Sequence, residues 1–509
     1  MSNLSRRYFF YGSLLTSAVP AAGYGSVPSL RALGYKPFYS KLNMGAIGCG
    51  GRGAIILGEA AATENIVALC DVDLQRGDEG IKKFAQAPIY RDFRTMLDKE
   101  GKNLDAVTIA IPDFMHATVA LACMQRGIHV YLEKPLTRTA WEARLLADAA
   151  AKYKVATQMG NQGYSHESHR VAAEMIWSGA IGDVTEVHVS TVPGTHPTAL
   201  QTLPPEESAP ASLNWQAWLG NTPMRPYSSY YVPYNWRGFY DFGTGQIGNW
   251  ATHAAGPVHH ALQLGAPDSV ECVAQDGPSK LTFPNRATIR LDFPARGSMP
   301  AVKVFYHDSA RSTDPDVYRV PGMENEIILP PQNNLTRKGR PMGSREERSP
   351  ATARPAAQTQ APPRGQRRGA GGAGVRVFGE DRTGPQPGLL TGNGAVFIGT
   401  KGIMATVDRG EGVWLLPAAR WAEYVLPPQL LTRSPGHMAD FIRAAKGGDA
   451  ACSHFGISGP YAEWLALAAL AFRVPGKLDW DSKAMRFSNS AEATRLVRPV
   501  VRPGWELKL

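Results

Sequence analysis

A glycine-rich segment near the start of the chain follows a fixed spacing. Residues 48–53 read Gly-Cys-Gly-Gly-Arg-Gly, which matches the pattern Gly-x-Gly-x-x-Gly. Glycines at this spacing permit a tight turn and let backbone N–H groups approach a pyrophosphate at a helix N-terminus. A strand-like segment precedes the motif and a helix-like segment follows it, as the motif requires. A glycine loop without a ligand is the alternative. We expect a dinucleotide to contact Gly48, Gly50, Gly51, Arg52 and Gly53.

An acidic residue follows the glycine motif at the end of the next apolar segment. Asp71 lies 23 residues after Gly48. A carboxylate at this place can accept hydrogen bonds from both hydroxyls of an adenosine ribose, and it repels a 2′-phosphate. Arg52 and Arg76 oppose that repulsion. The sequence therefore favours NAD over NADP as the cofactor.

A lysine follows a later apolar segment directly, in the sequence Glu133-Lys134-Pro135. Ligands of doubly wound folds bind outside the carboxyl ends of the parallel strands, so this placement puts Lys134 at the cofactor crevice. A lysine beside a positively charged nicotinamide can have its pKa lowered and then accept a hydroxyl proton. The alternative is a surface lysine before a proline turn.

The segments that carry these residues alternate between strand and helix patterns. Strands are predicted at 43–47, 66–70, 106–111, 129–132 and 155–159, and helices between them include 117–126 and 140–152. Strict alternation predicts a parallel sheet with right-handed crossovers. Residues 40–165 are thus expected to form a doubly wound, Rossmann-type nucleotide-binding domain of the α/β class.

The rest of the chain, residues 166–509, has many strand patterns and few helices. Strands are predicted at 185–191, 269–273, 287–293, 301–306 and 395–407, and helices at 169–178, 437–446 and 461–472. This pattern predicts a second, α+β domain on a mainly antiparallel open sheet. Residues 331–392 interrupt it with a basic insert rich in Arg, Pro, Gly, Ala and Gln, for which we expect disorder. A segment that binds anionic polymers is the alternative.

Five features together resemble the glucose-fructose oxidoreductase, inositol dehydrogenase and rhizopine catabolism (Gfo/Idh/MocA) family. They are the glycine loop, Asp71, residues 112–116, Glu133-Lys134-Pro135 and the glycine-flanked segment 179–182. The resemblance covers nearly all of residues 40–325 and resumes from about 392. It implies that Lys134 assists hydroxyl proton transfer. It also implies cofactor contacts by Pro112, His116, Glu133 and Gln162, with His166 and His169 close behind Gln162.

The family also has an Asp-x-x-x-His motif on a helix of the second domain, where a spacing of four directs both side chains into the cleft. The matching segment here is Asn249-Trp250-Ala251-Thr252-His253. Asn249 replaces the Asp, and an amide cannot act as a general base, although it can bind a sugar hydroxyl. Lys134 and His253 therefore remain the acid–base candidates. A satisfied core histidine is the alternative for His253.

An aromatic segment, residues 227–240, precedes this motif. Aromatic faces suit the apolar faces of pyranose rings, while Asn and Arg side chains can bind hydroxyls. The residues that we expect to bind substrate are Asn249, Trp236, Arg237, Tyr234 and His166. A plain core cluster is the alternative for the aromatic residues.

The net charge of +10 is concentrated in two places. Residues 331–390 hold eleven basic and four acidic residues, a net charge of +7, and Arg6 and Arg7 add +2. The remainder is close to neutral, which argues against a nucleic-acid groove on the folded body. The sequence has no zinc signature, no Ser-His-Asp order and no P-loop lysine, so we expect no metal site. Outside the leader, no apolar stretch of about 20 residues predicts a membrane span.

The first residues, 1–35, read as a signal peptide and linker. Arg6-Arg7 before a modest apolar run rich in small residues resembles a Tat export signal. An ordinary amphipathic N-terminus is the alternative. Folded export to the periplasm would suit a tightly bound NAD, loaded before translocation. The five scattered cysteines predict no disulfide framework.

Three functions fit these features. The first is an exported NAD-dependent oxidoreductase that acts on a sugar or cyclitol hydroxyl by hydride transfer, with a second substrate restoring the cofactor. The second is a redox-neutral, NAD-dependent glycoside hydrolase such as those of family 109. The third is an inactive sugar-binding homologue, for which Asn249 is the argument. A homo-oligomer through the open sheet is expected, because related proteins bury that face between subunits.

Overall fold

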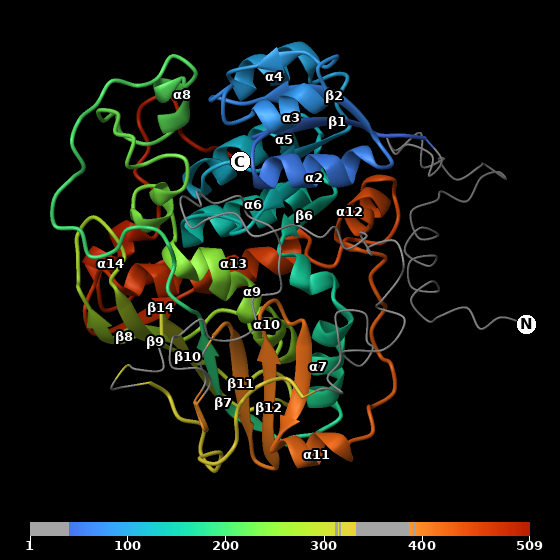
Figure 1. The fold of residues 1–509 in the computed structure, drawn as a ribbon, viewed down its shortest axis with the longest axis vertical. Coiled ribbons are helices and arrows are strands. Elements are labelled where there is room, and N and C mark those ends of the chain that lie inside the picture. Colours follow the sequence, from blue (N-terminus) through green and yellow to red (C-terminus); the bar gives the residue numbers. More distant parts are fainter. Residues whose placement is uncertain (1–39, 311–313, 315–316, 332–385, 390–391) are drawn as a thin grey trace, which may run out of the picture.

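The computed structural model describes residues 40–310, 314, 317–331, 386–389 and 392–509. The signal-peptide prediction and most of the basic insert lie outside the described residues. Figure 1 shows two sheets at opposite ends of the molecule, with helix α13 (Phe455–Ala471) crossing between them.

The first sheet has six parallel strands in the order β3-β2-β1-β4-β5-β6. Chain order reverses between β1 and β4, which is the switch point where doubly wound folds bind ligands. This confirms the predicted Rossmann-type sheet. The strands are β1 (Asn43–Ile47), β2 (Asn65–Cys70), β3 (Ile89–Tyr90), β4 (Ala106–Ile109), β5 (His129–Glu133) and β6 (Thr157–Gly160).

Helices connect these strands. A capping box fixes the start of α6: the Thr139 hydroxyl accepts the Glu142 N–H, and the Glu142 carboxylate accepts the Thr139 N–H. Such a box satisfies two of the backbone donors at a helix start. The helices of this domain are α2 (Arg52–Ala61), α3 (Asp78–Lys83), α4 (Phe93–Glu100), α5 (His116–Met124) and α6 (Ala140–Tyr153).

The second sheet has nine strands, and only its β7–β10 pair is parallel. The predicted mainly antiparallel domain is confirmed. The single strand predicted at 395–407 is wrong, because the chain turns at Thr400-Lys401 and returns as a hairpin. The strands are β7 (Val184–Ser190), β8 (Ser269–Asp276), β9 (Arg286–Phe293), β10 (Val302–Asp308), β11 (Gly394–Gly399), β12 (Gly402–Val407), β13 (Gly412–Leu416), β14 (Lys477–Asp481) and β15 (Arg486–Phe487).

Most of the remaining helices lie around this sheet and between the two domains, whereas α8 (Trp215–Leu219) and α12 (His437–Ala445) lie beside the first domain. The others are α7 (Glu167–Trp177), α9 (Thr252–Ala254), α10 (Gly256–Ala261), α11 (Ala418–Ala422), α13 and α14 (Ala491–Leu496). Short 3₁₀ turns η1 (Asp113–Met115), η2 (Gln162–Ser165) and η3 (Asn235–Gly238) and the π-helix η4 (Ile247–Ala251) complete the fold.

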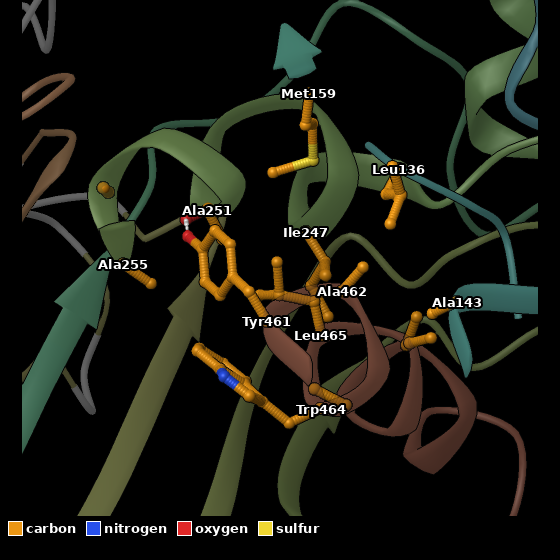
Figure 2. Close-up of a cluster of buried hydrophobic side chains, with 14 of the residues drawn as sticks. Leu136, Ala143, Met159, Ile247, Ala251, Ala255, Tyr461, Ala462, Trp464 and Leu465 are labelled. Carbon is orange, nitrogen blue, oxygen red and sulfur yellow. Dashed lines mark hydrogen bonds between the residues drawn. The ribbon is translucent and has the colours of Figure 1, made fainter. Parts of the chain in front are cut away.

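Helix α13 is buried almost all round, as expected of a helix enclosed by two layers. Figure 2 shows Tyr461, Trp464 and Leu465 of this helix beside Ile247 of η4 and Met159 of β6. The Tyr461 hydroxyl donates to the carbonyl of Thr252 at 2.8 Å. Helix α13 therefore anchors the segment that carries Asn249 and His253.

Helix α12 packs on the first sheet although it lies near the end of the chain. Phe441 is fully buried, and its ring meets that of Tyr131 of β5 edge-on at 5.8 Å. Met438 and Ile442 join the same cluster. The packing of the first domain thus extends beyond the predicted boundary at residue 165, because a C-terminal helix completes its cover.

Candidate active site

A cleft of about 530 Å³ lies at the carboxyl ends of β1, β4 and β5. Both domains line it. The predicted site residues found in its wall are Gly48, Gly50, Arg52, Asp71, Pro112, Glu133, Lys134, Gln162, Tyr234, Trp236, Arg237, Asn249 and His253. One cavity therefore brings together most of the residues selected from sequence.

The glycine loop is packed too closely for side chains. A Cβ on Gly48, which has a φ of +85°, would lie 2.2 Å from the Ala110 carbonyl oxygen. A Cβ on Gly53 would lie 2.1 Å from the Gly48 carbonyl oxygen. Gly53 and Gly51 do not themselves line the cleft; they shape the turn that presents Gly48 and Gly50.

Asp71 lies beside this loop and is held by two backbone donors. Its carboxylate accepts the N–H of Cys49 at 2.8 Å and the N–H of Asp73 at 3.0 Å. Burial raises the pKa of Asp71, while these two hydrogen bonds and Arg76 act in the opposite direction. The carboxylate is thus oriented toward the cofactor end of the cleft before any ligand binds.

Glu133 is committed to contacts within the protein. Its Oε1 accepts from Arg52 Nε at 2.8 Å and from Gln162 Nε2 at 3.1 Å. The carboxylate side chain is 7% exposed, whereas that of Arg52 is 37% exposed. This ion pair joins the start of α2 to the end of β5 and fixes the strand end that carries Lys134.

Lys134 reaches across the cleft to the second domain. Its Nζ donates to the backbone carbonyl of Asn249 at 2.7 Å and to the Asn249 Oδ1 at 2.9 Å. Loss of hydration on burial, followed by the positive charge of Arg237, lowers the pKa of Lys134 to about 7. At neutral pH a substantial fraction of this amine is therefore unprotonated and can accept a proton.

The Asn249 side chain is held in a fixed orientation on the π-helix η4. Its Nδ2 donates to Gln246 Oε1 at 2.9 Å and approaches the Tyr234 hydroxyl at 3.3 Å. Its Oδ1 is thereby left to face Lys134. A single turn of π-helix is a frequent feature of functional sites, because it re-aims side chains within a helix.

His253 also lines the cleft, and it is 5% exposed. Burial, with Lys134 and Arg409 nearby, lowers the pKa of His253 well below its ordinary value. The imidazole is therefore neutral at physiological pH and can donate or accept one hydrogen bond at each nitrogen. Its Nδ1 is buried without a hydrogen-bond partner among the described residues.

Tyr234, Trp236 and Arg237 come from the 3₁₀ turn η3 and the residue before it. The Arg237 guanidinium carbon lies 4.3 Å from the Tyr234 ring centre and 4.1 Å from that of Trp236. Trp236 Nε1 donates to the Pro233 carbonyl at 3.1 Å. The aromatic residues that were expected to bind a sugar ring thus also hold the guanidinium group of Arg237.

Two histidines selected from sequence do not line the cleft. His116 is fully buried, with Nδ1 2.7 Å from the Pro135 carbonyl and Nε2 2.9 Å from the Ile111 carbonyl. It therefore supports the turn after Lys134 instead of contacting the cofactor. His166 is the N-cap residue directly before α7 and lies outside the cleft wall.

Several cleft residues were not predicted as site residues from the sequence. Asp73 and Arg76 follow β2, and Asp113 begins η1. Trp250 and Arg409 lie at the opposite end, and Arg409 belongs to the turn between β12 and β13. Arg409 follows the basic insert, so no local motif links it to the glycine loop.

Three further features bear on the class of protein. Within the residues that the structure describes, no three His, Cys, Asp or Glu side chains converge as a metal site. All five cysteines are free thiols. In that same part of the chain, no helix has both the length and the apolarity that a bilayer crossing needs.

Family comparisons agree with this architecture. Residues 42–161 match the Gfo/Idh/MocA oxidoreductase family model for its NAD-binding Rossmann fold, and residues 170–281 match the family model for its C-terminal alpha/beta domain. The two matched segments belong to the Gfo/Idh/MocA oxidoreductase family. The N-terminal domain is accordingly an NAD-binding domain.

Individual relatives of this protein are distant. An inositol 2-dehydrogenase of Salmonella typhimurium is 30% identical over 162 residues, which cover 30% of this chain and 48% of the relative. A glycosyl hydrolase family 109 protein of Solibacter usitatus is 28% identical over 181 residues, 32% of this chain and 40% of the relative. The chain thus spans about half the length of the curated relatives that it matches.

A solved structure shares the fold. The WlbA dehydrogenase of Bordetella pertussis, in complex with NADH and UDP-GlcNAcA, superposes with a TM-score of 0.52 at 14% identity. The match covers 87% of this chain and 99% of that one. At this identity the comparison establishes a common architecture.

Proposed function

We propose that this protein is an NAD-dependent oxidoreductase that acts on a hydroxyl of a sugar or cyclitol. The observation that carries the proposal is the position of Lys134 in the cleft. Its amine lies at the carboxyl end of β5 with a pKa of about 7, and its hydrogen bonds to the described residues go to neutral oxygens of Asn249. General bases work best when their pKa lies near the working pH.

The residues present fit a dinucleotide. Gly48 and Gly50 bring the loop backbone to the cleft wall without side chains of their own, and the N-terminus of α2 favours a pyrophosphate there. The Asp71 carboxylate is oriented for the hydroxyls of an adenosine ribose. NAD, when bound, supplies the hydride acceptor for the carbon that bears the reacting hydroxyl.

The proton of that hydroxyl passes to the neutral Lys134 amine, and the resulting ammonium is held by the two oxygens of Asn249. In the reverse direction the same ammonium returns a proton to the carbonyl oxygen. His253, neutral and buried, orients a substrate hydroxyl through a hydrogen bond. Tyr234 and Trp236 offer aromatic faces for the apolar side of a ring.

Export through the Tat system and a cofactor retained between turnovers remain part of the proposal. Arg6 and Arg7 support export, although they lie outside the described residues. An exported enzyme meets no pool of free NAD, so a second substrate must restore the bound cofactor. A homo-oligomer through the second sheet is proposed on the same footing, because the open sheet offers a broad face for pairing.

A redox-neutral glycosidase is the second candidate, and the family 109 relative is the observation that favours it. In that reaction a sugar carbon is oxidised, the aglycone leaves by elimination, water adds, and the carbon is reduced again. No net NAD is consumed. Lys134 would handle the same hydroxyl proton in the first and last steps.

Purification followed by denaturation tests cofactor retention, because released dinucleotide is identified by its absorbance and mass. The NAD-loaded protein is then mixed with sugars, cyclitols and aryl glycosides. Stoichiometric nicotinamide reduction by a free sugar supports the oxidoreductase. Aglycone release without net reduction supports the glycosidase. Absence of both reactions across the panel contradicts an enzymatic function.

A further inference from the structure

Two arginines that line the cleft near Lys134 and Asn249 lack a carboxylate partner among the described residues. The Arg237 guanidinium lies over the rings of Tyr234 and Trp236, and its one hydrogen bond within the described part of the chain is a long one, 3.5 Å, to the Tyr234 carbonyl. Arg409 lies with its guanidinium carbon 5.6 Å from the Trp250 ring centre. Among the described residues, no acidic oxygen lies within 4 Å of either guanidinium group.

The nearby acids are already engaged. Glu133 is paired with Arg52 at 2.8 Å, and Asp113 accepts the Thr244 hydroxyl at 2.6 Å. Both arginines are close enough to Lys134 for their charges to lower its pKa. Asp408 also acts electrostatically on Arg409, but it does not line the cleft. Arg237 and Arg409 therefore present positive charge to the cleft beside Lys134.

Partly buried cations are costly to maintain unless something compensates them. A guanidinium stacked on aromatic rings keeps its N–H edge free for a planar, bidentate acceptor such as a carboxylate or a phosphate. Tyr234 links this stack to Asn249, and Trp250 is the residue after Asn249. Both arginines are thus placed around the same point as Lys134.

We propose that Arg237 and Arg409 form an anion-binding subsite, and that the substrate is a sugar acid whose carboxylate is held there. This inference rests on the proposed function, and it narrows the substrate class from sugars in general to sugar acids. The subsite holds the anionic group and so fixes which hydroxyl of the ring faces Lys134.

The pyrophosphate of the dinucleotide is the other source of a suitable anion. The two sources differ in their consequences. If the arginines bind the substrate, their loss weakens binding of sugar acids and leaves NAD affinity unchanged. If they bind the cofactor, their loss weakens NAD binding and affects acidic and neutral sugars equally.

The test compares matched pairs of compounds with the NAD-loaded, full-length protein: D-glucuronate with D-glucose, D-galacturonate with D-galactose, and D-gluconate with D-glucitol. Binding is measured by calorimetry and turnover by nicotinamide absorbance. We expect at least one acid to bind roughly 10- to 100-fold more tightly than its neutral partner, as a charge-assisted bidentate contact provides. Arg237→Gln and Arg409→Gln should each reduce this preference by about tenfold or more.

The control variant is Arg473→Gln, because Arg473 also lies over an aromatic ring, 4.9 Å from the Tyr240 centre, but does not line the cleft. It should keep the native preference. Equal binding of acids and neutral partners, or a loss of NAD affinity alone in the Arg237 and Arg409 variants, would overturn the subsite. Tight binding of an acid without any reduction of NAD would preserve the subsite and contradict the proposed oxidoreductase.

Discussion

The amine of Lys134 donates to both oxygens of Asn249, at 2.7 Å to the backbone carbonyl and at 2.9 Å to the side chain. Both acceptors are neutral. They hold the lysine in place without the strong stabilisation of its charge that a carboxylate would give. The replacement of the family's Asp by Asn249 thus changes the properties of Lys134 more directly than those of His253.

Asn249→Asp should shift the pH dependence of hydride transfer to higher pH. The native rate of hydroxyl oxidation should rise as the pH passes about 7, because only the neutral amine accepts a proton. A carboxylate 2.9 Å away favours the ammonium form of Lys134. The pH at which the rate reaches half of its maximum should therefore rise by about 1 pH unit or more. Single-turnover rates between pH 5 and 10 measure this shift. Asn249→Ala is the control, since it removes the acceptor without adding charge. An unchanged pH dependence in the Asp variant would contradict the coupling of these two residues.

Asp71→Ala should weaken NAD binding and narrow the preference for NAD over NADP. The carboxylate is oriented by two backbone N–H groups, and Arg76 beside it could receive a 2′-phosphate once the repulsion is gone. Calorimetry with both dinucleotides checks the prediction. Asp98→Asn, at a side chain that is 69% exposed and lies outside the cleft wall, should retain the native preference. Equal or tighter binding of NADP by the native protein would show that Asp71 does not select the cofactor.

Phe441→Ala should destabilise the protein by about 3–5 kcal/mol, the usual cost of truncating a fully buried phenylalanine. The ring meets Tyr131 across the face of the first sheet, so the variant tests whether helix α12 is part of that domain. Urea unfolding provides the measurement. Leu430→Ala, at a side chain that is 63% exposed, serves as the control. A loss below about 1 kcal/mol would mean that α12 contributes little to the first domain.

Changing both Arg6 and Arg7 to Lys should trap the precursor in the cytoplasm, because the twin arginine is the part of the leader that resembles a Tat signal. Cell fractionation followed by mass spectrometry of the N-terminus reports the outcome. Arg486→Lys, at an exposed position of β15, is a control for general effects on expression. Mature protein outside the cytoplasm in the double variant would exclude this route.

The first domain was predictable from sequence because its signals are local. Strand, glycine loop and helix follow one another within a short stretch, and the Asp71 position is set by the length of one crossover. The sequence predicts one strand where β11 and β12 form a hairpin. The apolar pattern continues on both sides of the two-residue turn, which is too short to show as a break between two strands. Contact between α12 and the first sheet could not be inferred, because it joins segments about 300 residues apart.

The site was predictable where a motif defines it. Lys134, Asn249 and His253 line one cleft, as the helical spacing and the strand end indicated. The family resemblance implied a cofactor contact for His116, whereas both ring nitrogens face backbone carbonyls. Arg409 was missed because a turn far along the chain brings it to the cleft.

The most direct test of the proposed chemistry compares the native protein with Lys134→Ala. Single-turnover reduction of bound NAD is followed at the nicotinamide absorbance, with a sugar that the native protein oxidises. Lys134→Arg provides a control that keeps the positive charge but cannot act as a base at neutral pH. Both variants should bind NAD as the native protein does, because the glycine loop and Asp71 hold the dinucleotide. The rate should be lower by roughly 10²–10⁴ in both variants, the usual contribution of general acid–base catalysis. A Lys134→Ala protein that reduces its cofactor at the native rate would rule out Lys134 as the base.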